Sequence, residues 1–350
     1  MVKSTVIPEG TLRIGRNLKV YEKTAKSWKI SKKEFPQAQN AIKIFKAHGN
    51  FRELINKNNP SFLKGQLSPK GDVQGGRILV LPNGEKIDKA YSLFAKNLTF
   101  HDESSHEHWD LIYQNPNGKF AYCYTLDKKN KASREKYRKV EKFEKVYPEL
   151  EKNVQKALKD KSDIYALPMY TLLKTYMRVG NELNYRATGH KGLTTLTKKD
   201  ISISKDHATF NYISKSGVPM IIYQSFPLEY IQRLKNNIKN KKTSDFIFTD
   251  ENSKPLKDTD FMKAFENYCG EKFYPHIVRS FYATNRAKEF LKNHTSAKKE
   301  EIKVLFTEIA EKLGHKKFDK KQNEWKDSYT VTIHHYIQPD LVQKIQSLVR

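Results

Sequence analysis

The sequence predicts an α+β protein with a small β-containing N-terminal domain and a larger, mainly helical C-terminal domain that carries one small antiparallel sheet. Two observations predict this class. Before about residue 130 the chain is broken by Gly, Pro and Asn and holds short apolar segments of strand length. Beyond that point helical periodicity dominates and is interrupted once by alternating segments. We therefore expect two domains, residues 1–130 and residues 131–350.

The expected strands of the first domain lie at residues 77–81, 109–113 and 120–124. The last two flank Gln114-Asn-Pro-Asn-Gly118, a strong turn signal, so they should form a hairpin. Residues 38–46 are the candidate helix of this domain. The polar run at residues 127–131 is interpreted as a linker, and a basic helix with alternating surface charges should follow it over residues 132–158.

The second domain should begin its core with an amphipathic helix, because Met169, Leu172, Leu173 and Tyr176 have helical spacing. This helix should end near residues 178–180 and place Arg178 at its C-terminal end.

Alternating segments at residues 201–203, 209–213 and 218–223 predict a small antiparallel sheet with Lys215 at a turn. A later apolar stripe from Ile302 to Leu313 predicts a long helix that Gly314 terminates, with His315 just beyond it.

Charge points to a polyanionic partner. The chain has 65 Lys and Arg against 39 Asp and Glu, a formal net charge of +26, and 37% hydrophobic residues suffice for buried cores. A lysine-rich surface can also serve solubility alone. Tyrosines interleaved with basic residues favour nucleic acid, and the candidate DNA-binding residues are Tyr122, Tyr124, Lys136 and Arg138.

Cysteine usage and hydropathy favour a soluble protein of a reducing, intracellular compartment. The two cysteines, Cys123 and Cys269, cannot form a disulfide framework or a four-cysteine zinc site. The N-terminus lacks the apolar core of a signal peptide, and no run of about 18 apolar residues occurs, so no membrane association is expected.

Five residues in chain order point to chemistry at a phosphodiester: Arg178, Lys215, Arg279, His315 and Tyr336. Transesterification of a phosphate needs cations on the non-bridging oxygens, an acid for the departing sugar oxygen, and a nucleophile that holds the phosphoryl group. Two arginines can present planar forks to the phosphate, and a lysine on a hairpin can protonate the leaving 5′ oxygen. Taken singly, each is more often a surface residue.

The histidines and the tyrosine complete this set. His276 and Arg279 are three residues apart at an expected helix start, so both can donate to one phosphate, which makes His276 a further DNA-binding candidate. His315 can donate to a phosphate oxygen. Tyr336 has an unperturbed pKa near 10, so its attack at neutral pH requires a cationic pocket or an assisting base.

The motifs around these residues resemble those of type IB DNA topoisomerases of the poxvirus and bacterial kind. Residues 178–196 resemble that family's signature, and Ile213-Ser-Lys-Ser-Gly217 resembles its hairpin lysine segment. Arg279 in Val-Arg-Ser-Phe resembles the second catalytic arginine, His315 in Leu-Gly-His the catalytic histidine, and Tyr336 in His-Tyr-Ile-Gln-Pro the nucleophile. The similarity covers roughly residues 100–345.

The resemblance implies a C-shaped clamp, in which the N-terminal and catalytic domains enclose double-stranded DNA. It implies a monomer that forms a 3′-phosphotyrosyl link, lets the free 5′ end rotate and reseals the strand without ATP, metal or other cofactor. No nucleotide-binding Gly-x-x-x-x-Gly-Lys-Ser motif is present. The location would be intracellular, at DNA: the nucleus, or for a viral protein a cytoplasmic replication site or the virion.

Alternatives stay open. His276 stands where such topoisomerases usually carry Lys, and His-x-x-Arg followed by Leu-Gly-His is also the pattern of tyrosine recombinases. A recombinase would need a four-subunit synapse, a helical N-terminal domain and a protruding C-terminal helix. The β-containing front part and the 14 residues after Tyr336 favour the topoisomerase. A DNA-binding protein without catalysis is the third possibility.

Two segments have no assigned role. Residues 318–326 resemble an inserted basic loop between His315 and Tyr336, and Tyr329 beyond it is an alternative nucleophile. The cluster from His101 to Asp110 is interpreted as a polar loop, although His106 and His108 would share one face of a strand and could bind a divalent metal.

Overall fold

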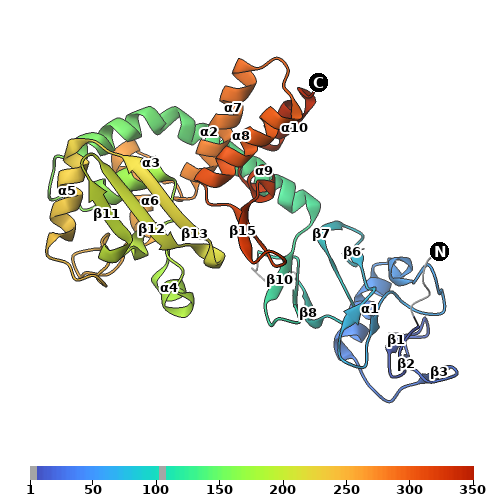
Figure 1. Ribbon diagram of the computed structural model, residues 1–350. Coiled ribbons are helices and arrows are strands. Elements are labelled where there is room, and N and C mark those ends of the chain that lie inside the picture. Colours follow the sequence, from blue (N-terminus) through green and yellow to red (C-terminus); the bar gives the residue numbers. More distant parts are fainter. Residues whose placement is uncertain (1–5, 102–107) are drawn as a thin grey trace. The chain divides into compact units, whose positions relative to one another are not determined.

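The computed structural model describes residues 6–101 and 108–350, and its contacts divide the chain into two compact units, residues 1–135 and residues 136–350 (Figure 1). The helix α2 (Leu126–Ala157) runs through the boundary. The linker expected at residues 127–131 is therefore wrong: this segment is the first turn and a half of α2. Asp127 in the first turn complements the helix dipole.

The first unit contains small antiparallel sheets and one long helix. One sheet has the strand order β3-β2-β1-β4-β5, a second has the order β10-β9-β8, and β6 pairs with β7. The bounds are β1 Leu12–Ile14, β2 Val20–Lys23, β3 Trp28–Ile30, β4 Gln66–Leu67, β5 Val73–Gln74, β6 Ile78–Val80, β7 Lys86–Tyr91, β8 Lys96–Phe100, β9 Leu111–Gln114 and β10 Phe120–Cys123.

The elements expected in this unit are present. Helix α1 (Pro36–Ala47) buries Ala38, Ala41, Ile42 and Phe45 against the strands, because these residues share one face. Strands β9 and β10 form the predicted hairpin around the Asn-Pro-Asn-Gly turn, with Tyr113 opposite Ala121. The first unit thus has its own hydrophobic core.

The second unit is mainly helical, as predicted, with a three-stranded antiparallel sheet in the order β11-β12-β13 and a two-stranded hairpin, β14-β15. The elements after α2 are α3 Ala166–Thr175, α4 Glu182–Thr188, β11 Ile201–Ser204, β12 His207–Ile213, β13 Pro219–Ser225, α5 Leu228–Lys239, α6 Asp258–Cys269, α7 Ile277–Asn293, α8 Lys299–Lys312, β14 Lys316–Asp319, β15 Glu324–Asp327, α9 Thr330–His335 and α10 Pro339–Ser347.

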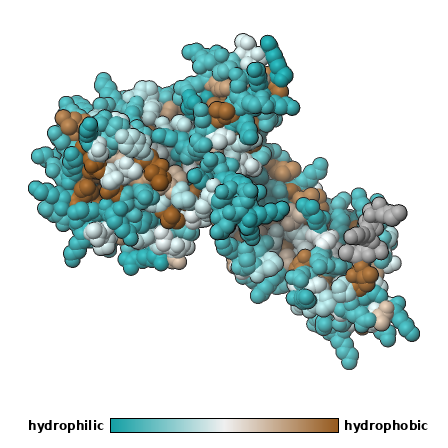
Figure 2. All heavy atoms as spheres, viewed as in Figure 1, coloured by the Kyte–Doolittle hydropathy of each residue, from teal (hydrophilic) through white to brown (hydrophobic). Residues whose placement is uncertain are grey.

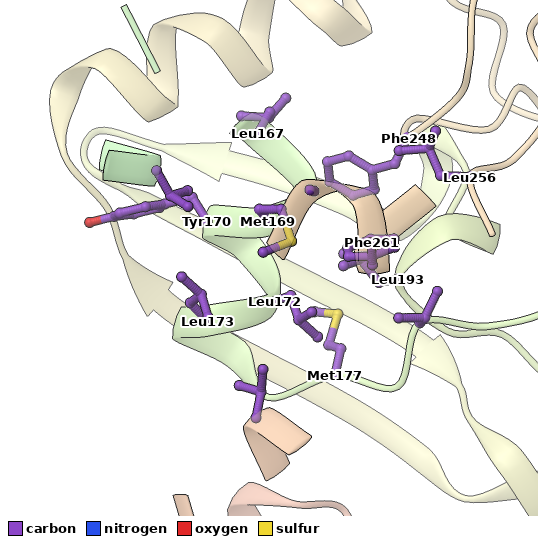
Figure 3. Close-up of a cluster of buried hydrophobic side chains, with 14 of the residues drawn as sticks. Leu167, Met169, Tyr170, Leu172, Leu173, Met177, Leu193, Phe248, Leu256 and Phe261 are labelled. Carbon is purple, nitrogen blue, oxygen red and sulfur yellow. The ribbon is translucent and has the colours of Figure 1, made fainter. Parts of the chain in front are cut away.

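Helix α3 differs from its prediction. It is buried on nearly all sides instead of on one stripe, since only Lys174 of its residues is not buried. Figure 3 shows Leu172 and Met177 directed into a cluster with Leu193 and Phe261. The helix ends at Thr175, and Tyr176 takes a left-handed conformation with φ of 56°. Arg178 therefore follows the helix in extended chain.

The C-terminal helices form a second core in this unit. Helices α7, α8, α9 and α10 pack around Leu305, Ile309, Ile337 and Ile345, and Tyr336 belongs to the same cluster. Helix α8 ends as predicted, with Gly314 at φ of 67°. The segment expected as a basic loop is instead the β14–β15 hairpin.

The surface is largely hydrophilic, with apolar patches over the β11-β12-β13 sheet (Figure 2). Ile221 on β13 has the highest exposed fraction of the apolar side chains there, 72%. Within the described ranges, none of the helices combines the length and apolarity that a bilayer crossing demands.

Candidate active site

A cavity of about 560 Å³ in the second unit collects four of the five candidate catalytic residues. Arg178, Lys215, Arg279 and His315 all contribute to its lining. They come from the segment after α3, the β12–β13 turn, helix α7 and the end of α8. The fifth residue, Tyr336, adjoins this cavity through its hydroxyl, to which Arg178 donates a hydrogen bond of 3.0 Å.

Arg178 is positioned by the backbone on both sides of it. Met177 and Val179 are buried, so the arginine between them points the other way. The Arg178 carbonyl accepts a hydrogen bond of 2.8 Å from the Leu193 amide. Gly192 makes this approach possible, because a Cβ there would lie 2.6 Å from that carbonyl oxygen. A rigid pair of segments therefore presents the guanidinium.

Arg279 is a buried cation held by backbone carbonyls. It lies in the first turn of α7, is 3% exposed, and donates to the carbonyls of Tyr176 and Leu313. Burial lowers the pKa of its guanidinium to about 10, so it remains charged at neutral pH. Its Cζ lies 5.3 Å from the centroid of the Tyr336 ring.

His315 is neutral and its tautomer is set by its partners. The Arg279 NH2 group lies 3.2 Å from His315 Nε2, and since arginine can only donate, Nε2 must accept. The proton is then on Nδ1 and is donated to the hydroxyl of Thr332, 2.8 Å away. Burial, then the charges of Arg279 and Arg178, lower the pKa of His315 to about 3.

Tyr336 lies among cationic and imidazole side chains and is 3% exposed. Its ring centroid is 4.5 Å from that of His315 and 5.0 Å from that of His276. The Nζ of Lys136 lies 5.5 Å from the same centroid. The Tyr336 amide donates to the Thr332 carbonyl at 2.9 Å, so Thr332 contacts both the tyrosine and the histidine. Two cations, Lys136 and Arg279, thus lie over the Tyr336 ring.

The alternative tyrosine has different surroundings. Tyr329 precedes α9, and its ring packs against Phe306 of α8 with the centroids 5.9 Å apart. Its position favours Tyr336 as the candidate nucleophile.

Lys215 lies at the β12–β13 turn, as predicted, and its side chain is exposed. Its positive charge affects the ionisation of His276. After burial, the charges of Arg279, Arg178, Lys136 and Lys215 lower the pKa of His276 to about 3. Four cations therefore converge on one small region, the arrangement that a bound phosphate would neutralise.

The candidate DNA-binding residues fall into both units. In the second unit, Lys136 donates to the His335 carbonyl, and burial lowers the pKa of Lys136 to about 8, whereas Arg138 is exposed on α2. In the first unit, Tyr122 is 39% exposed and stacks on His108 with the centroids 5.6 Å apart, and Tyr124 lies 6.1 Å from the same imidazole.

Sequence reasoning missed Thr332, which fixes the His315 tautomer. It named Lys136 as a DNA-binding candidate but not the contact of this lysine with the His335 carbonyl, next to the candidate nucleophile. The possible metal cluster at residues 101–110 has its central part, residues 102–107, outside the described residues. Among the described residues no group of three His, Cys, Asp or Glu is placed to hold a metal ion.

This geometry defines a site in which a buried tyrosine, the candidate nucleophile, is surrounded by cationic side chains. Comparison with known proteins agrees with it. Residues 125–338 match the family model described as eukaryotic DNA topoisomerase I, catalytic core, and the chain belongs to this family.

A relative in Acanthamoeba polyphaga mimivirus, described as DNA topoisomerase 1B, is 27% identical over 217 residues. The match spans 57% of this chain and 64% of that protein, just under two thirds of the relative's length.

Among solved structures, two complexes of the XerH site-specific recombinase align with a TM-score of 0.33 and 16% identity. The pre-cleavage complex with difH covers 50% of each chain, and the post-cleavage complex with palindromic difH covers 57% of this chain and 51% of the other.

Proposed function

We propose that the protein is a type IB DNA topoisomerase, which relaxes supercoiled duplex DNA through a transient 3′-phosphotyrosyl intermediate. One observation carries the proposal: Arg178 donates to the Tyr336 hydroxyl at 3.0 Å beside the cavity that Arg279 and His315 also line. The family match over residues 125–338 and the description of the mimivirus relative support the same reaction.

In the proposed reaction Tyr336 Oη attacks the phosphorus, loses its proton to water, and displaces the 5′ oxygen. Arg178 and Arg279 would stabilise the charge that grows on the non-bridging oxygens. Arg279 would exchange one of its present acceptors, such as His315 Nε2, for a phosphate oxygen. His315 would take up a proton and donate to the second oxygen.

Lys215 is proposed as the general acid that protonates the leaving 5′ oxygen. An alkoxide is a poor leaving group, and general-acid help is worth about 10² to 10⁴ in rate. Its place at the β12–β13 turn, on the rim of the cavity, supports this role. Resealing is the reverse: the 5′ hydroxyl returns its proton to Lys215 and displaces Tyr336.

The proposed partner is double-stranded DNA, bound by a monomer inside the cell at sites of DNA. The first unit, with Tyr122 and Tyr124, is proposed to clamp the duplex, and the net charge of +26 supports extensive phosphate contacts. Neither ATP nor metal is required in this scheme, because the phosphotyrosyl bond conserves the phosphodiester energy.

The test is incubation of supercoiled plasmid with the full chain in EDTA and without ATP. We expect relaxation through a ladder of topoisomers, and none with Tyr336→Phe. Absence of relaxation by the wild-type protein, combined with strand exchange between duplexes that share a site, would instead identify a tyrosine recombinase. DNA binding without any covalent adduct would leave only a binding protein.

A further inference from the structure

The β14–β15 hairpin lies beside the candidate site, and the proposed reaction does not use it. It starts directly after His315, and its strands pair from Lys316 opposite Asp327 to Asp319 opposite Glu324. The amide of Ser328, at the end of the hairpin, donates to the His315 carbonyl at 3.1 Å. The base of the hairpin is thus closed on a residue of the candidate site.

The hairpin also lies close to the turn that carries Lys215. Trp325 on β15 stacks edge to face on Phe318 with the centroids 5.2 Å apart, and it packs half-buried against the core of the second unit. A methyl group at Gly217 would lie 3.8 Å from Trp325 Cζ2, ordinary van der Waals contact. Figure 1 shows β15 near the turn end of β12 and β13.

The Lys215 turn itself is short and has few internal restraints. The Ser214 amide donates to the Val218 carbonyl at 2.7 Å, and the Gly217 amide to the Ser214 carbonyl at 3.0 Å. Ser216 has φ of 68°, a conformation that costs free energy unless the surroundings hold it. Lys215 is exposed on this turn, and general-acid catalysis requires its ammonium group to be held within hydrogen-bond reach of the leaving oxygen.

Charge pairing within the hairpin argues against a purely phosphate-binding arm. Lys326 pairs with Asp319 at 2.9 Å and with Glu324 at 3.4 Å, and Lys316 lies 3.8 Å from Asp327. Two lysines of the hairpin are therefore paired with carboxylates of the hairpin itself. Its aromatic side, by contrast, lies beside the Lys215 turn, since a Cβ at Gly217 would be 3.8 Å from Trp325 Cζ2.

We propose that the β14–β15 hairpin is a positioning element for the general acid, with Trp325 as the positioning residue that holds the turn carrying Lys215. The inference rests on the proposed function and deepens it. The hairpin lies between His315 and the Lys215 turn, because its base is hydrogen-bonded to His315 and Trp325 lies beside Gly217. Loss of Trp325 should therefore impair protonation of the leaving group more than DNA binding or nucleophilic attack.

The test compares two cleavage substrates, one with the natural 5′ bridging oxygen and one with a bridging sulfur. A thiolate leaves without protonation, so a defect in general-acid delivery vanishes on the sulfur substrate. We expect Trp325→Ala to lose about 10- to 100-fold in cleavage rate on the oxygen substrate, within the general-acid contribution. On the sulfur substrate it should cleave near the wild-type rate, as Lys215→Ala should.

Two further variants complete the experiment. Trp325→Phe keeps an aromatic ring against the turn and should recover most of the oxygen-substrate rate. Lys321→Ala, on the exposed tip of the same hairpin, should match wild type on both substrates. Thermal melting shows whether Trp325→Ala is folded. If it is not, Phe318→Ala, which removes the ring that packs on Trp325, is tested on the oxygen and sulfur substrates instead.

Equal rate losses on both substrates, or no loss on the oxygen substrate, would overturn the positioning role. If Trp325→Ala weakened DNA binding and changed nothing else, the hairpin would be a DNA-binding arm, and the positioning role would again be overturned. If wild-type protein forms no covalent adduct with either substrate, the proposed function itself is wrong, and that outcome is distinct from all of these.

Discussion

The candidate nucleophile, Tyr336, has two arginines close to its ring and hydroxyl. A phenol with a pKa near 10 is almost wholly protonated at neutral pH, so stabilisation of the phenolate decides which tyrosine reacts. The Tyr336 hydroxyl accepts a 3.0 Å hydrogen bond from Arg178, and the Arg279 guanidinium lies over the same ring. Reactivity should therefore depend on this contact rather than on exposure.

We predict that Tyr336→Phe binds DNA with near wild-type affinity but forms no covalent adduct, because the ring and its packing are kept and only the nucleophilic oxygen is lost. Tyr329→Phe should form the adduct at close to the wild-type rate. The measurement is adduct formation on a labelled duplex, resolved by denaturing electrophoresis. Adduct in Tyr336→Phe together with none in Tyr329→Phe would reverse the assignment.

The neutral state of His315 leads to a pH prediction. Its pKa in the folded protein is lowered to about 3 by burial and by Arg279 and Arg178, below the ordinary value of 6.5. The unfolded chain therefore binds more protons, so stability is complete above about pH 6.5 and is lost as pH falls toward about 3. From about pH 7 to pH 5, this one group should cost about 2 kcal/mol.

Urea unfolding of the free protein at several pH values measures this effect. His315→Gln should weaken the pH dependence, and the same variant of the exposed His48 should leave it unchanged. A duplex bound to the site neutralises the arginines, so it should reduce the loss at low pH. A pH dependence identical in wild type and His315→Gln would show that the histidine does not carry this penalty.

Local motifs indicated the five candidate catalytic residues, but not the contacts that support them. Arg178, Lys215, Arg279 and His315 each lie beside a glycine or within a short recognisable pattern, and the structure brings all four to one cavity. Thr332 and Lys136 act through contacts with residues that are 17 and 199 positions away. No pattern along the chain indicates such contacts, because they depend on how the helices pack.

At the scale of elements, the end of helix α8 fixes the position of His315. Gly314 terminates α8 with φ of 67°, and the Cβ of an alanine there would lie 2.5 Å from the Sδ of Met220 on β13. Gly270 terminates α6 in the same way, with φ of 74°, and nothing lies within 4 Å of the corresponding position. The two glycines differ in their surroundings, and only Gly314 directly precedes a residue of the candidate site.

We predict that Gly314→Ala and Gly270→Ala each destabilise the protein by about 1 to 2 kcal/mol, the cost of a left-handed alanine. Only Gly314→Ala should also slow cleavage, by roughly 10- to 100-fold, because the clash with Met220 displaces His315. Thermal melting and single-turnover cleavage measure the two effects. Equal cleavage rates in the two variants would mean that the end of α8 does not control the histidine.

Element types were more predictable than their surroundings. The β9–β10 hairpin and helix α8 are indicated by turn residues and apolar spacing, which are local properties. The apolar spacing of α3 predicts an amphipathic helix, but the helix is buried on nearly all sides and packs against both β13 and α5. The β14–β15 hairpin is not predictable in this way, since lysines replace the alternating apolar residues that usually mark strands, and Trp325 and Phe318 alone provide its apolar side.

For the whole molecule, the distribution of charge between the two units decides how DNA would be held. The net charge of +26 belongs to the entire chain, whereas all five candidate catalytic residues lie in residues 136–350. The first unit has a separate hydrophobic core and presents Tyr122 at its surface. If this unit clamps the duplex, it should contribute phosphate contacts but no chemistry.

We predict that the full chain loses about 10³ to 10⁵ in DNA affinity between about 50 and 200 mM salt, as expected for about 6 to 10 phosphate contacts. Removal of residues 1–125, just before α2 begins at Leu126, keeps that helix whole and leaves the catalytic unit intact. The shortened protein should bind more weakly and with a flatter salt dependence, since each lost contact reduces the slope by about 0.9. Fluorescence anisotropy with a labelled duplex measures the slope, and circular dichroism checks that the shortened chain is folded. An unchanged slope in a folded fragment would mean that the first unit makes no phosphate contacts, and the clamp would have to be abandoned.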